Sequence, residues 1–583
     1  MQYLEDPRQT ELFDVFEGIL SPVAYQKLRG GWQHLFRCVI LQLMPARQLA
    51  EHFDPVIGRP TKELYSMAAL IFVMEFRNWT HEEAADAYMF NVDLQYALNL
   101  RPDGQSMCRR TIERYLRLFR EDELAKQIML DVTAELVKQL ELDVSKQRLD
   151  STHVESNMAK FGRIKLMATA IRRFLVQVQR HDEGSYKRLP RSIRERYEAS
   201  PNSVFGWKKL DGEEVDELRQ SVAEDLCYLV DRYRRNKKHN RRSTYQMLAT
   251  VFEQQCEVVD DKVSVKKRTG GDIVCNPSDP DATLDGHKGS GYQVQLSETC
   301  SDQNDVQLIV SAIPETACQN DSTSLKTVVD ELKEQRLVPD EMLADTAYGG
   351  DDNHVGCAEE GIDLISPTSG KCPEDHADPD GITTADFQVE LREKTDEYGR
   401  RAMVPTCTSC PAGKEPHRSF YDSWLDQITI LQFPEICGKC PLREKCPNRF
   451  ANGWSQVTIK AKEVRLINRR RHEQTPEFRA KYRVRSGIEA TNSILKRVTG
   501  LDRVRVRGRP AVFSSILLKV AGWNILQAAR VRSLLLKLIQ GGGFARFGQS
   551  CLRPNGFRML RRAFRSLRAT SQPGFLRIQA IAA

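Results

Sequence analysis

The segment from Lys146 to Pro367 constrains the fold most, because its hydrophobic pattern changes repeatedly between the periods of strand and helix. A strand ending at Asp150 is predicted within residues 146–154, and alternating apolar residues predict a half-buried strand at 291–299. The further predicted elements are a dense apolar strand at 305–315, a helix at 322–335, a strand ending at Asp345 and a strand at 361–367. This order predicts an α/β fold built on a mixed sheet with helices.

Helices are predicted on both sides of the first strand. Residues 1–140 follow the helical period, and Thr80 with Glu83 three residues later predicts a capping box. A basic helix follows at 106–122. Short helices joined in this way are compatible with a helix-turn-helix DNA reader, although small helical bundles show the same pattern. We therefore expect a helical N-terminal domain at 1–140, and a helical insertion at about 160–257.

The chain loses its periodicity from about residue 368 to residue 455, where Pro, Gly and Cys punctuate it. This composition predicts an insertion rather than a layer of the sheet. Helical periodicity then returns, so residues 141–367 and 456–530 together are predicted to form the catalytic core. Residues 531–583 contain many basic residues and a Gly-Gly-Gly run, and they predict a basic tail.

The predicted insertion contains a cluster of five cysteines. They are arranged as two Cys-x2-Cys pairs and one further cysteine: Cys407, Cys410, Cys437, Cys440 and Cys446. Two such pairs are typical of a structural Zn²⁺ site, for which four of the five thiols would suffice. His417 is a further candidate ligand. The alternative is a cysteine-rich loop that binds no metal.

The charge of the chain is unevenly distributed. The formal net charge is +7, but the residues after Leu501 contain a single acid, Asp502, among many arginines. A second basic run lies at 231–242. Dense cationic runs favour a phosphate-backbone partner, here double-stranded DNA. The N-terminus does not resemble a signal peptide, and the apolar stretches at 64–76 and 516–526 are too short or too interrupted to span a bilayer, so we expect an intracellular protein with no membrane partner.

Four polar residues near the C-terminal end repeat with helical spacing. Tyr482, Arg485, Glu489 and Lys496 would fall within an arc of about 60° on a helix that turns about 100° per residue. The opposite face would carry five apolar residues, namely Val484, Ile488, Ile494, Leu495 and Val498. Gly487 interrupts this stripe, and the helix could therefore begin only after Arg485. The arrangement is also compatible with a solvated helix face with ion pairs.

Three acidic residues could complete one site. Asp150 and Asp345 each end a predicted strand, where α/β sheets carry functional groups, and Glu489 lies on the predicted helix. Three ionised carboxylates need cations between them, and two Mg²⁺ ions suit carboxylates and phosphate oxygens. Asp143, Asp351 and Asp352 lie near the first two and are competing candidates. The triad Asp150, Asp345 and Glu489 is preferred because each aspartate directly ends a predicted strand.

The order of these motifs resembles the DDE transposases of bacterial insertion sequences that carry the Tyr-Arg-Glu-Lys signature. The residues that carry the resemblance are Leu-Asp-Ser-Thr around Asp150, Ala-Asp-Thr-Ala-Tyr around Asp345, and the stripe Tyr482, Arg485, Glu489 and Lys496. The resemblance covers about residues 60–530. It implies an RNase H-like catalytic core in which Asp150, Asp345 and Glu489 hold Mg²⁺. It also implies that Arg485 and Lys496, assisted by Tyr482, hold the DNA backbone.

The same resemblance implies an activity and its partners. The family cuts DNA at the ends of its element and joins the freed 3′-hydroxyls to target DNA. An oligomer acting on paired inverted repeats in the bacterial cytoplasm is expected, with residues 60–120 binding those repeats. Two alternatives remain: a transposase-derived DNA-binding protein without catalysis, and an RNase H-like nuclease that hydrolyses DNA without strand transfer.

Overall fold

The computed structural model describes residues 1–8, 14–103, 105–205, 210–370, 382–395 and 401–541. Most of the predicted basic tail, residues 542–583, lies outside the described residues. The part of 531–583 that is described contains the helix α22 (Arg532–Gly541).

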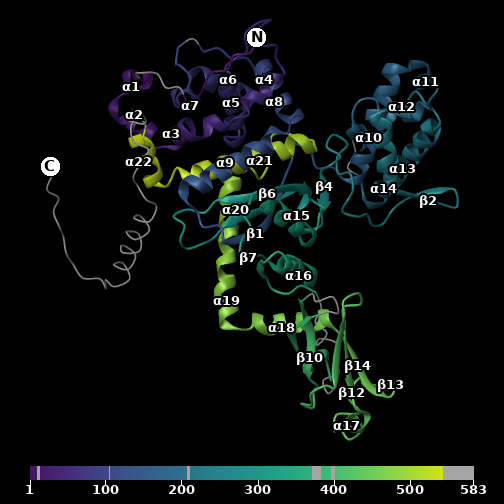
Figure 1. Cartoon of the computed structure of the whole chain (residues 1–583). Helices are drawn as coiled ribbons and strands as arrows, with labels where there is room; N and C mark the ends of the chain where they lie inside the picture. Colours follow the sequence, from purple (N-terminus) through teal and green to yellow (C-terminus); the bar gives the residue numbers. More distant parts are fainter. Residues whose placement is uncertain (9–13, 104, 206–209, 371–381, 396–400, 542–583) are drawn as a thin grey trace, which may run out of the picture.

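A mixed sheet forms the centre of the molecule (Figure 1). Its strands run in the spatial order β6–β5–β1–β7–β8, and β4 adds a short pairing to β5. The strands β6, β5 and β1 pair antiparallel, whereas β1, β7 and β8 pair parallel. The bounds of the strands are β1 Lys146–Val154, β4 Thr283–Asp285, β5 Gly289–Thr299, β6 Ile309–Thr316, β7 Glu341–Leu343 and β8 Asp363–Ile365. The predicted mixed α/β architecture is confirmed, and it is consistent with an RNase H-like domain.

The strand β5 differs from its prediction, because it is buried on both faces rather than on one. One face packs on a core that includes Tyr292, Val294 and Leu296 together with the helix α21 (Arg509–Ala528). The other face carries Gln293 and Gln295, whose amides bond acceptors at the end of β6 and at the start of the helix α15 (Asp321–Glu334). Alternating polarity therefore reflected a polar buried face and not a solvated one.

The N-terminal region is helical, as predicted. Its α-helices are α1 Val15–Ile19, α2 Pro22–Arg29, α3 Trp32–Leu35, α4 Ala46–Glu51, α5 Leu64–Phe76, α6 His81–Phe90, α7 Val92–Ala97, α8 Arg109–Glu121 and α9 Leu124–Leu140. The capping box of Thr80 and Glu83 is present at the start of α6. Most of these helices share one continuous hydrophobic core with β5, β6 and α21 (Arg509–Ala528). They therefore cover one face of the sheet.

The helix α21 is the central packing element between the sheet and the N-terminal helices. It contacts α9, α5 and β6, and Asn524 bonds the backbone of Ile309 in β6. Among the described residues it is the one helix long and apolar enough to cross a membrane, and 83% of its apolar window is buried inside the protein. Its apolar composition is accounted for by this burial.

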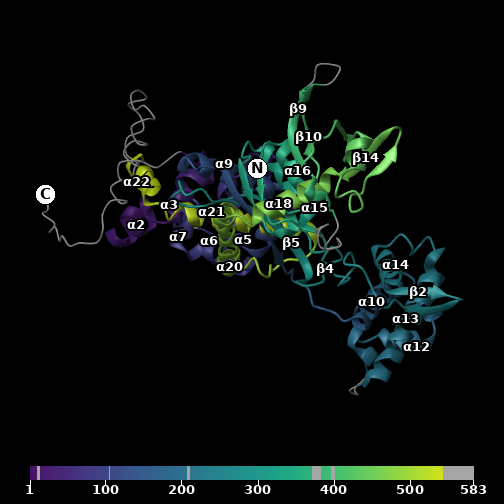
Figure 2. The same cartoon turned by 90° about the horizontal axis from the view of Figure 1, so that it is seen from below.

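A group of helices between β1 and β4 packs around a second core and stands away from the sheet (Figures 1 and 2). These helices are α10 Arg163–His181, α11 Glu183–Lys187, α12 Arg191–Tyr197, α13 Gly212–Arg234 and α14 Ser243–Gln255. A hairpin of β2 (Cys256–Val259) and β3 (Lys262–Val265) follows them. We call residues 163–265 the helical lobe.

The cysteine-rich region contains strands that the sequence did not predict. A four-stranded sheet runs in the order β11–β12–β14–β13, and β9 pairs with β10. The bounds are β9 Gln388–Thr395, β10 Arg401–Ser409, β11 Arg418–Asp422, β12 Gln427–Gln432, β13 Arg449–Ala451 and β14 Trp454–Lys460, with the short helix α17 at Pro434–Gly438. The region was predicted to be an insertion without periodic elements rather than a layer of the central sheet, and the prediction missed that it forms sheets of its own. Burial alternates along β12 with a period of two, but the strand has only six residues. So short an alternation is difficult to recognise in the sequence.

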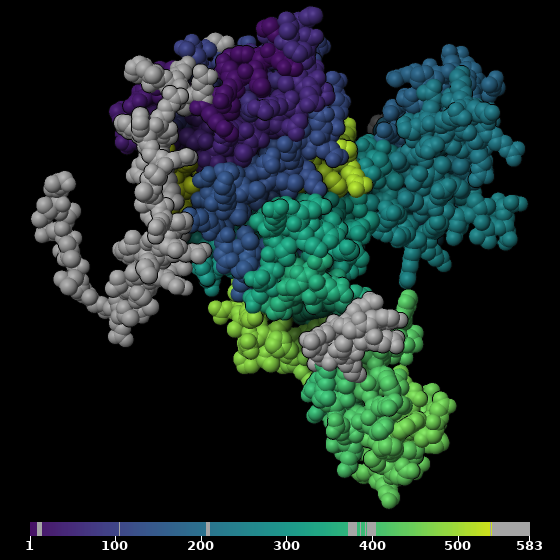
Figure 3. All heavy atoms as spheres, in the orientation of Figure 1, coloured from purple at the N-terminus to yellow at the C-terminus, as the bar shows by residue number. Residues whose placement is uncertain are grey.

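Helices lead from this second sheet back to the first. The helices after the second sheet are α18 Ala461–Glu473, α19 Pro476–Tyr482 and α20 Gly487–Thr499. The helix α16 (Asp351–Glu359) precedes the second sheet in the chain. The space-filling view in Figure 3 shows the cysteine-rich region and the helical lobe projecting as separate masses from the central body.

Candidate active site

The register of the central strands brings Asp150 and Asp345 to the same level. Arg148 of β1 is the parallel partner of Leu343, the last residue of β7. Asp150 and Asp345 each lie two residues after this pair, so they lie side by side on neighbouring segments. Asp345 was predicted to end its strand, and it lies two residues beyond Leu343, where β7 ends. Asp150 does not end its strand, because β1 continues to Val154 through its antiparallel pairing with β5. That pairing partner was not visible in the local sequence.

Asp345 also has a local structural role. Its carboxylate accepts a hydrogen bond of 2.9 Å from the backbone N–H of Ala347 and caps a short 3₁₀ turn. Its backbone carbonyl accepts from the Ser366 hydroxyl, which follows β8. These bonds fix the turn after β7, and the second carboxylate oxygen remains directed toward Arg485.

The predicted continuous helix from Tyr482 to Lys496 is interrupted. Tyr482 ends α19, Arg485 lies in a 3₁₀ turn at 483–486, and α20 begins at Gly487. Only Glu489 and Lys496 therefore share one helix. The prediction that all four side chains share one arc of a single helix was wrong. The alternative, that the helix begins only after Arg485, is correct.

The apolar face of α20 is also narrower than predicted. Ile488 and Leu495 are fully buried, whereas Val498 is 44% exposed. Thr491, Asn492 and Thr499 are buried instead. The side chains of Thr491 and Asn492 bond Glu298 and Asp150 beneath the helix, and the Thr499 hydroxyl donates to the Leu495 carbonyl within it. Polar residues thus complete the packing of this helix on the sheet.

Arg485 lies between the three carboxylates of the proposed triad. Its guanidinium is 2.6 Å from Glu489 Oε1, 3.2 Å from Asp150 Oδ1 and 3.9 Å from Asp345 Oδ2. The side chains of Arg485 and Asp150 are 14% and 15% exposed, and that of Glu489 is 61% exposed. The structure therefore brings the three acids together around one cation, and the site opens to solvent on the side of α20.

The Asp150 carboxyl lies in the most desolvated position of the three. Burial raises its pKa to about 6, while the charge of Arg485 opposes this shift and the charge of Asp345 adds to it. Asn492 of α20 donates a hydrogen bond of 3.1 Å to the second oxygen of Asp150. Both oxygens of this carboxylate are therefore held by groups from the C-terminal segment.

A buried ion pair positions the start of α20. Arg148 pairs with Glu298 of β5 at 2.6 Å and donates to the backbone carbonyl of Val484 at 3.2 Å. The other oxygen of Glu298 accepts from the Thr491 hydroxyl at 2.8 Å. A Cβ on Gly487 would lie 1.8 Å from the Arg148 guanidinium, so only glycine leaves room for this contact. The sequence analysis missed these residues, which no local pattern connects.

The competing acids lie outside this constellation. Asp143 accepts hydrogen bonds from Ser301 and Ser145, Asp351 is buried against Arg465 and Arg469, and Asp352 is 94% exposed beside Lys462. Their contacts are those of structural and surface residues. None of the three contacts Arg485 in the described structure.

The other residues of the stripe lie at the border of the site. Tyr482 stacks on Phe478 with ring centroids 5.7 Å apart. Lys496 lies on α20, where its ammonium is 3.6 Å from Asp502. It stays a prediction that DNA is contacted by Tyr482, Arg485 and Lys496.

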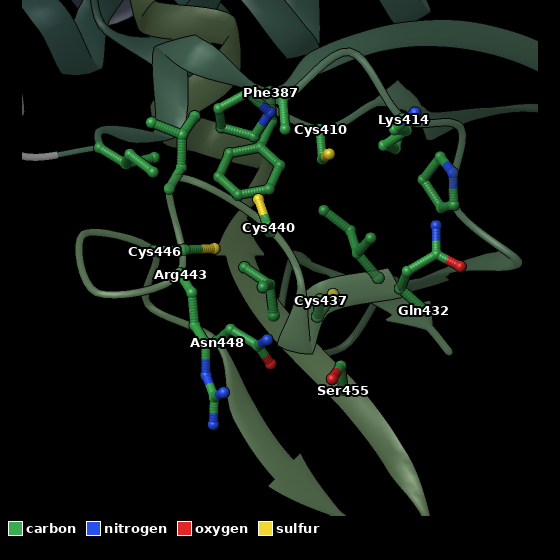
Figure 4. A pocket seen from close by; sticks show the side chains of 17 residues that line it. Phe387, Cys410, Lys414, Gln432, Cys437, Cys440, Arg443, Cys446, Asn448 and Ser455 are labelled. Carbon is green, nitrogen blue, oxygen red and sulfur yellow. The ribbon is translucent and has the colours of Figure 1, made fainter. Parts of the chain in front are cut away.

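Four of the five clustered cysteines line one small cavity of about 50 Å³ (Figure 4). They are Cys410, Cys437, Cys440 and Cys446. Cys407 is buried in β10 and directs its sulfur to the backbone carbonyl of Ser409 at 3.4 Å. The imidazole of His417 stacks on Trp454 with ring centroids 4.9 Å apart. The structure thus separates four thiols from the two other candidate ligands.

Neither site forms a closed metal cage. Within the described ranges, no group of three or more His, Cys, Asp or Glu side chains is arranged to hold a metal ion. In the acidic site the Arg485 guanidinium lies where a cation would neutralise the carboxylates. The donor types nevertheless fit the expected metals, since carboxylates suit Mg²⁺ and thiolates suit Zn²⁺.

Clustered acids beside a mixed sheet define a candidate phosphoryl-transfer site. Residues 409–529 match the family model described as Transposase DDE domain. The matched segment contains Arg485 and Glu489 but not Asp150 or Asp345. No match was found among curated proteins. The family match supports a DDE transposase and implies a DNA substrate.

Proposed function

We propose that this protein is a DNA transposase that cleaves the ends of an insertion sequence and joins the freed 3′-hydroxyls to target DNA. The observation that carries the proposal is the convergence of Asp150, Asp345 and Glu489 on Arg485. These acids come from a central strand, the end of its parallel neighbour and a distant helix, and the family match covers that helix. The Tyr-Arg-Glu-Lys signature and the bacterial origin belong to the same proposal.

The reaction has two in-line displacements at phosphorus. Attack of water at the element end breaks the P–O3′ bond and releases a 3′-hydroxyl. The oxygen of that hydroxyl then attacks a target phosphodiester and forms the new P–O bond, while the P–O3′ bond of the target breaks and leaves a 3′-hydroxyl on the target strand. Asp150, Asp345 and Glu489 would hold two Mg²⁺ ions, which when bound stabilise the attacking and leaving oxygens. Arg485, Lys496 and Tyr482 would orient the DNA backbone, and Asn492 would orient Asp150.

Cleavage and joining of a labelled duplex that carries the element's terminal inverted repeat test this function. Asp345→Asn and Glu489→Gln should each lower Mg²⁺-dependent cleavage by at least about 1,000-fold, while binding of the ends is retained. Asp352→Asn is the matched control, because this neighbouring carboxylate is exposed and outside the site. Undiminished cleavage by Glu489→Gln would refute the catalytic assignment.

The same assay separates the alternatives. Joined products identify a transposase, nicked products without joining identify a nuclease, and end binding without nicking identifies a non-catalytic DNA-binding protein. Because DNA ends are processed in pairs in the proposed reaction, we also expect an oligomer in the DNA complex.

We also propose that the cysteine-rich region binds one structural Zn²⁺ through Cys410, Cys437, Cys440 and Cys446. Their common cavity supports this choice of four from the five cysteines. The thiolates would tie the loop at the end of β10 to the chain between β12 and β13. This would stabilise a small sheet whose own core is limited.

A further inference from the structure

The loop between α13 and α14 concentrates positive charge at the end of the helical lobe. Residues 231–242 contain seven Lys and Arg residues and one acid, Asp231. Arg235, Lys237 and Arg241 are exposed, and none of the three makes an ion pair within the described structure. Arg180, at the end of α10, is also exposed. Cations packed at this density repel one another unless an anion neutralises them.

This loop, which we call the basic loop (residues 234–242), has a fixed conformation. His239 is fully buried, and its ring contacts the rings of Tyr233 and Phe174 edge to face. Its Nε2 lies 3.3 Å from Asp182, which also pairs with Lys238 at 3.2 Å. Successive backbone bonds, from Asn236 N–H to Arg242 N–H, close the turn on itself. The cations are therefore presented by a preorganised scaffold.

The positive charges gather at one place. The pKa of His181 is lowered by desolvation and then by the charges of Arg242 and Arg180. The basic loop and the end of α10 thus form one cationic surface from two segments about 60 residues apart in sequence. Residues 231–242 contribute no exposed large apolar side chain that could enter a bilayer.

We propose that the basic loop is a sequence-independent binding surface for the phosphate backbone of double-stranded DNA, separate from the catalytic site. The helix α10 has 19 residues. At about 1.5 Å per residue the surface lies about 28 Å from the base of the lobe. The lobe projects from the central body beside β4 (Figures 1 and 2), so this surface would hold DNA outside the cleavage site. The inference extends the proposed transposase function, but the binding itself requires no catalysis.

Fluorescence anisotropy of a 40-base-pair duplex of arbitrary sequence, without Mg²⁺, tests this proposal over about 50–200 mM salt. The variant Arg235→Gln/Lys237→Gln/Arg241→Gln should bind at least about tenfold more weakly at low salt. Its slope of log affinity against log salt should be shallower by about 2.7, because each lost phosphate contact contributes about 0.9. Circular dichroism and thermal melting check that the variant is folded.

The matched control is Lys187→Gln/Arg191→Gln/Lys326→Gln, which removes the same charge from cations already paired with Glu183, Glu195 and Asp330. A slope equal to that of this control would overturn the proposal, as would a wild-type protein that does not bind the duplex. Binding to anionic phosphatidylserine vesicles that depends on the basic loop, with duplex binding unchanged, would assign the surface to a membrane instead. Since neither arm measures cleavage, failure here is distinguishable from failure of the proposed chemistry.

Discussion

The guanidinium of Arg485 lies 3.2 Å from the carboxylate of Asp150, although the two residues are 335 positions apart in the chain. The same guanidinium bonds Glu489 at 2.6 Å. It therefore neutralises a group of acids whose mutual repulsion would otherwise destabilise the folded protein. Any divalent cation that binds these acids must compete with Arg485 for them.

Replacing Arg485 with Met should tighten the binding of Mn²⁺ to the free protein by about tenfold or more. The reason is that a competing charge about 3–4 Å from the ligands contributes several kcal/mol even at an effective dielectric of about 20. Electron paramagnetic resonance of free Mn²⁺ measures the affinity. Arg485→Lys is the control that keeps the charge, and it should change the affinity less. Weaker Mn²⁺ binding by Arg485→Met would show that Arg485 supports the site rather than competing for it.

The binding of Mn²⁺ should depend on pH through Asp150. Because its pKa is raised to about 6, the carboxyl is protonated in the folded protein at pH 5, and a metal ion must displace that proton. The apparent affinity should fall by about fivefold from pH 6 to pH 5, because half of the carboxyl groups are already protonated at pH 6. Titrations of Mn²⁺ at several pH values measure this slope. In Asp150→Asn, binding should be weak and its slope below pH 6 shallower, and an unchanged slope would assign the proton to another group.

Gly487→Ala should destabilise the protein by about 2–4 kcal/mol. The new methyl group would displace the Arg148 guanidinium from Glu298 and leave a buried carboxylate unpaired. Urea denaturation measures the change in the free energy of unfolding. Hydrogen exchange of the α20 amides measures the local destabilisation. Gly356→Ala is the control, because its Cβ would meet nothing within 4 Å in a helix.

A double-mutant cycle assigns this cost to the contact. In an Arg148→Ala background the collision is absent, so the additional effect of Gly487→Ala should be small. Equal costs in both backgrounds would mean that Gly487 is required for the backbone of α20 and not for the space beside Arg148.

Zinc content should distinguish the five cysteines. Protein purified with Zn²⁺ should contain about one equivalent, and Cys440→Ser should lose it, because Cys440 lines the shared cavity. Cys407→Ser should retain the metal, since its sulfur lies on the Ser409 carbonyl. Inductively coupled plasma mass spectrometry provides the measurement. Zinc-free wild-type protein, or equal loss from both variants, would contradict the proposed ligand set.

Removal of zinc should affect stability more than chemistry. A chelator should lower the melting temperature of the cysteine-rich region, because thiolate coordination stabilises a sheet that buries few apolar residues. Proteolysis within 409–446 should become faster in the chelated protein. An unchanged rate of proteolysis would show that the fold of this region does not depend on metal.

Local sequence determined the elements of the central sheet. The runs around Leu149, Val294 and Val329 carry the periods of strand and helix in their own residues, and the capping box at Thr80 requires only a neighbour three residues away. Such signals lie within one element, so they can be predicted without knowing its partners. The strand β12 escaped prediction because its alternation extends over six residues only.

The tertiary structure alone decided how the site is assembled. Asp150 lies in mid-strand because β5 pairs beyond it, and Arg485 faces the acids because the helix breaks before Gly487. The break is held by Arg148 and Glu298, which are 150 residues apart. The sequence by itself supplied the acids, the cations and the five thiols. Which of these side chains come into contact depended on strand pairing and packing between segments distant in the chain. The free energies of these long-range contacts cannot be read from a local sequence pattern.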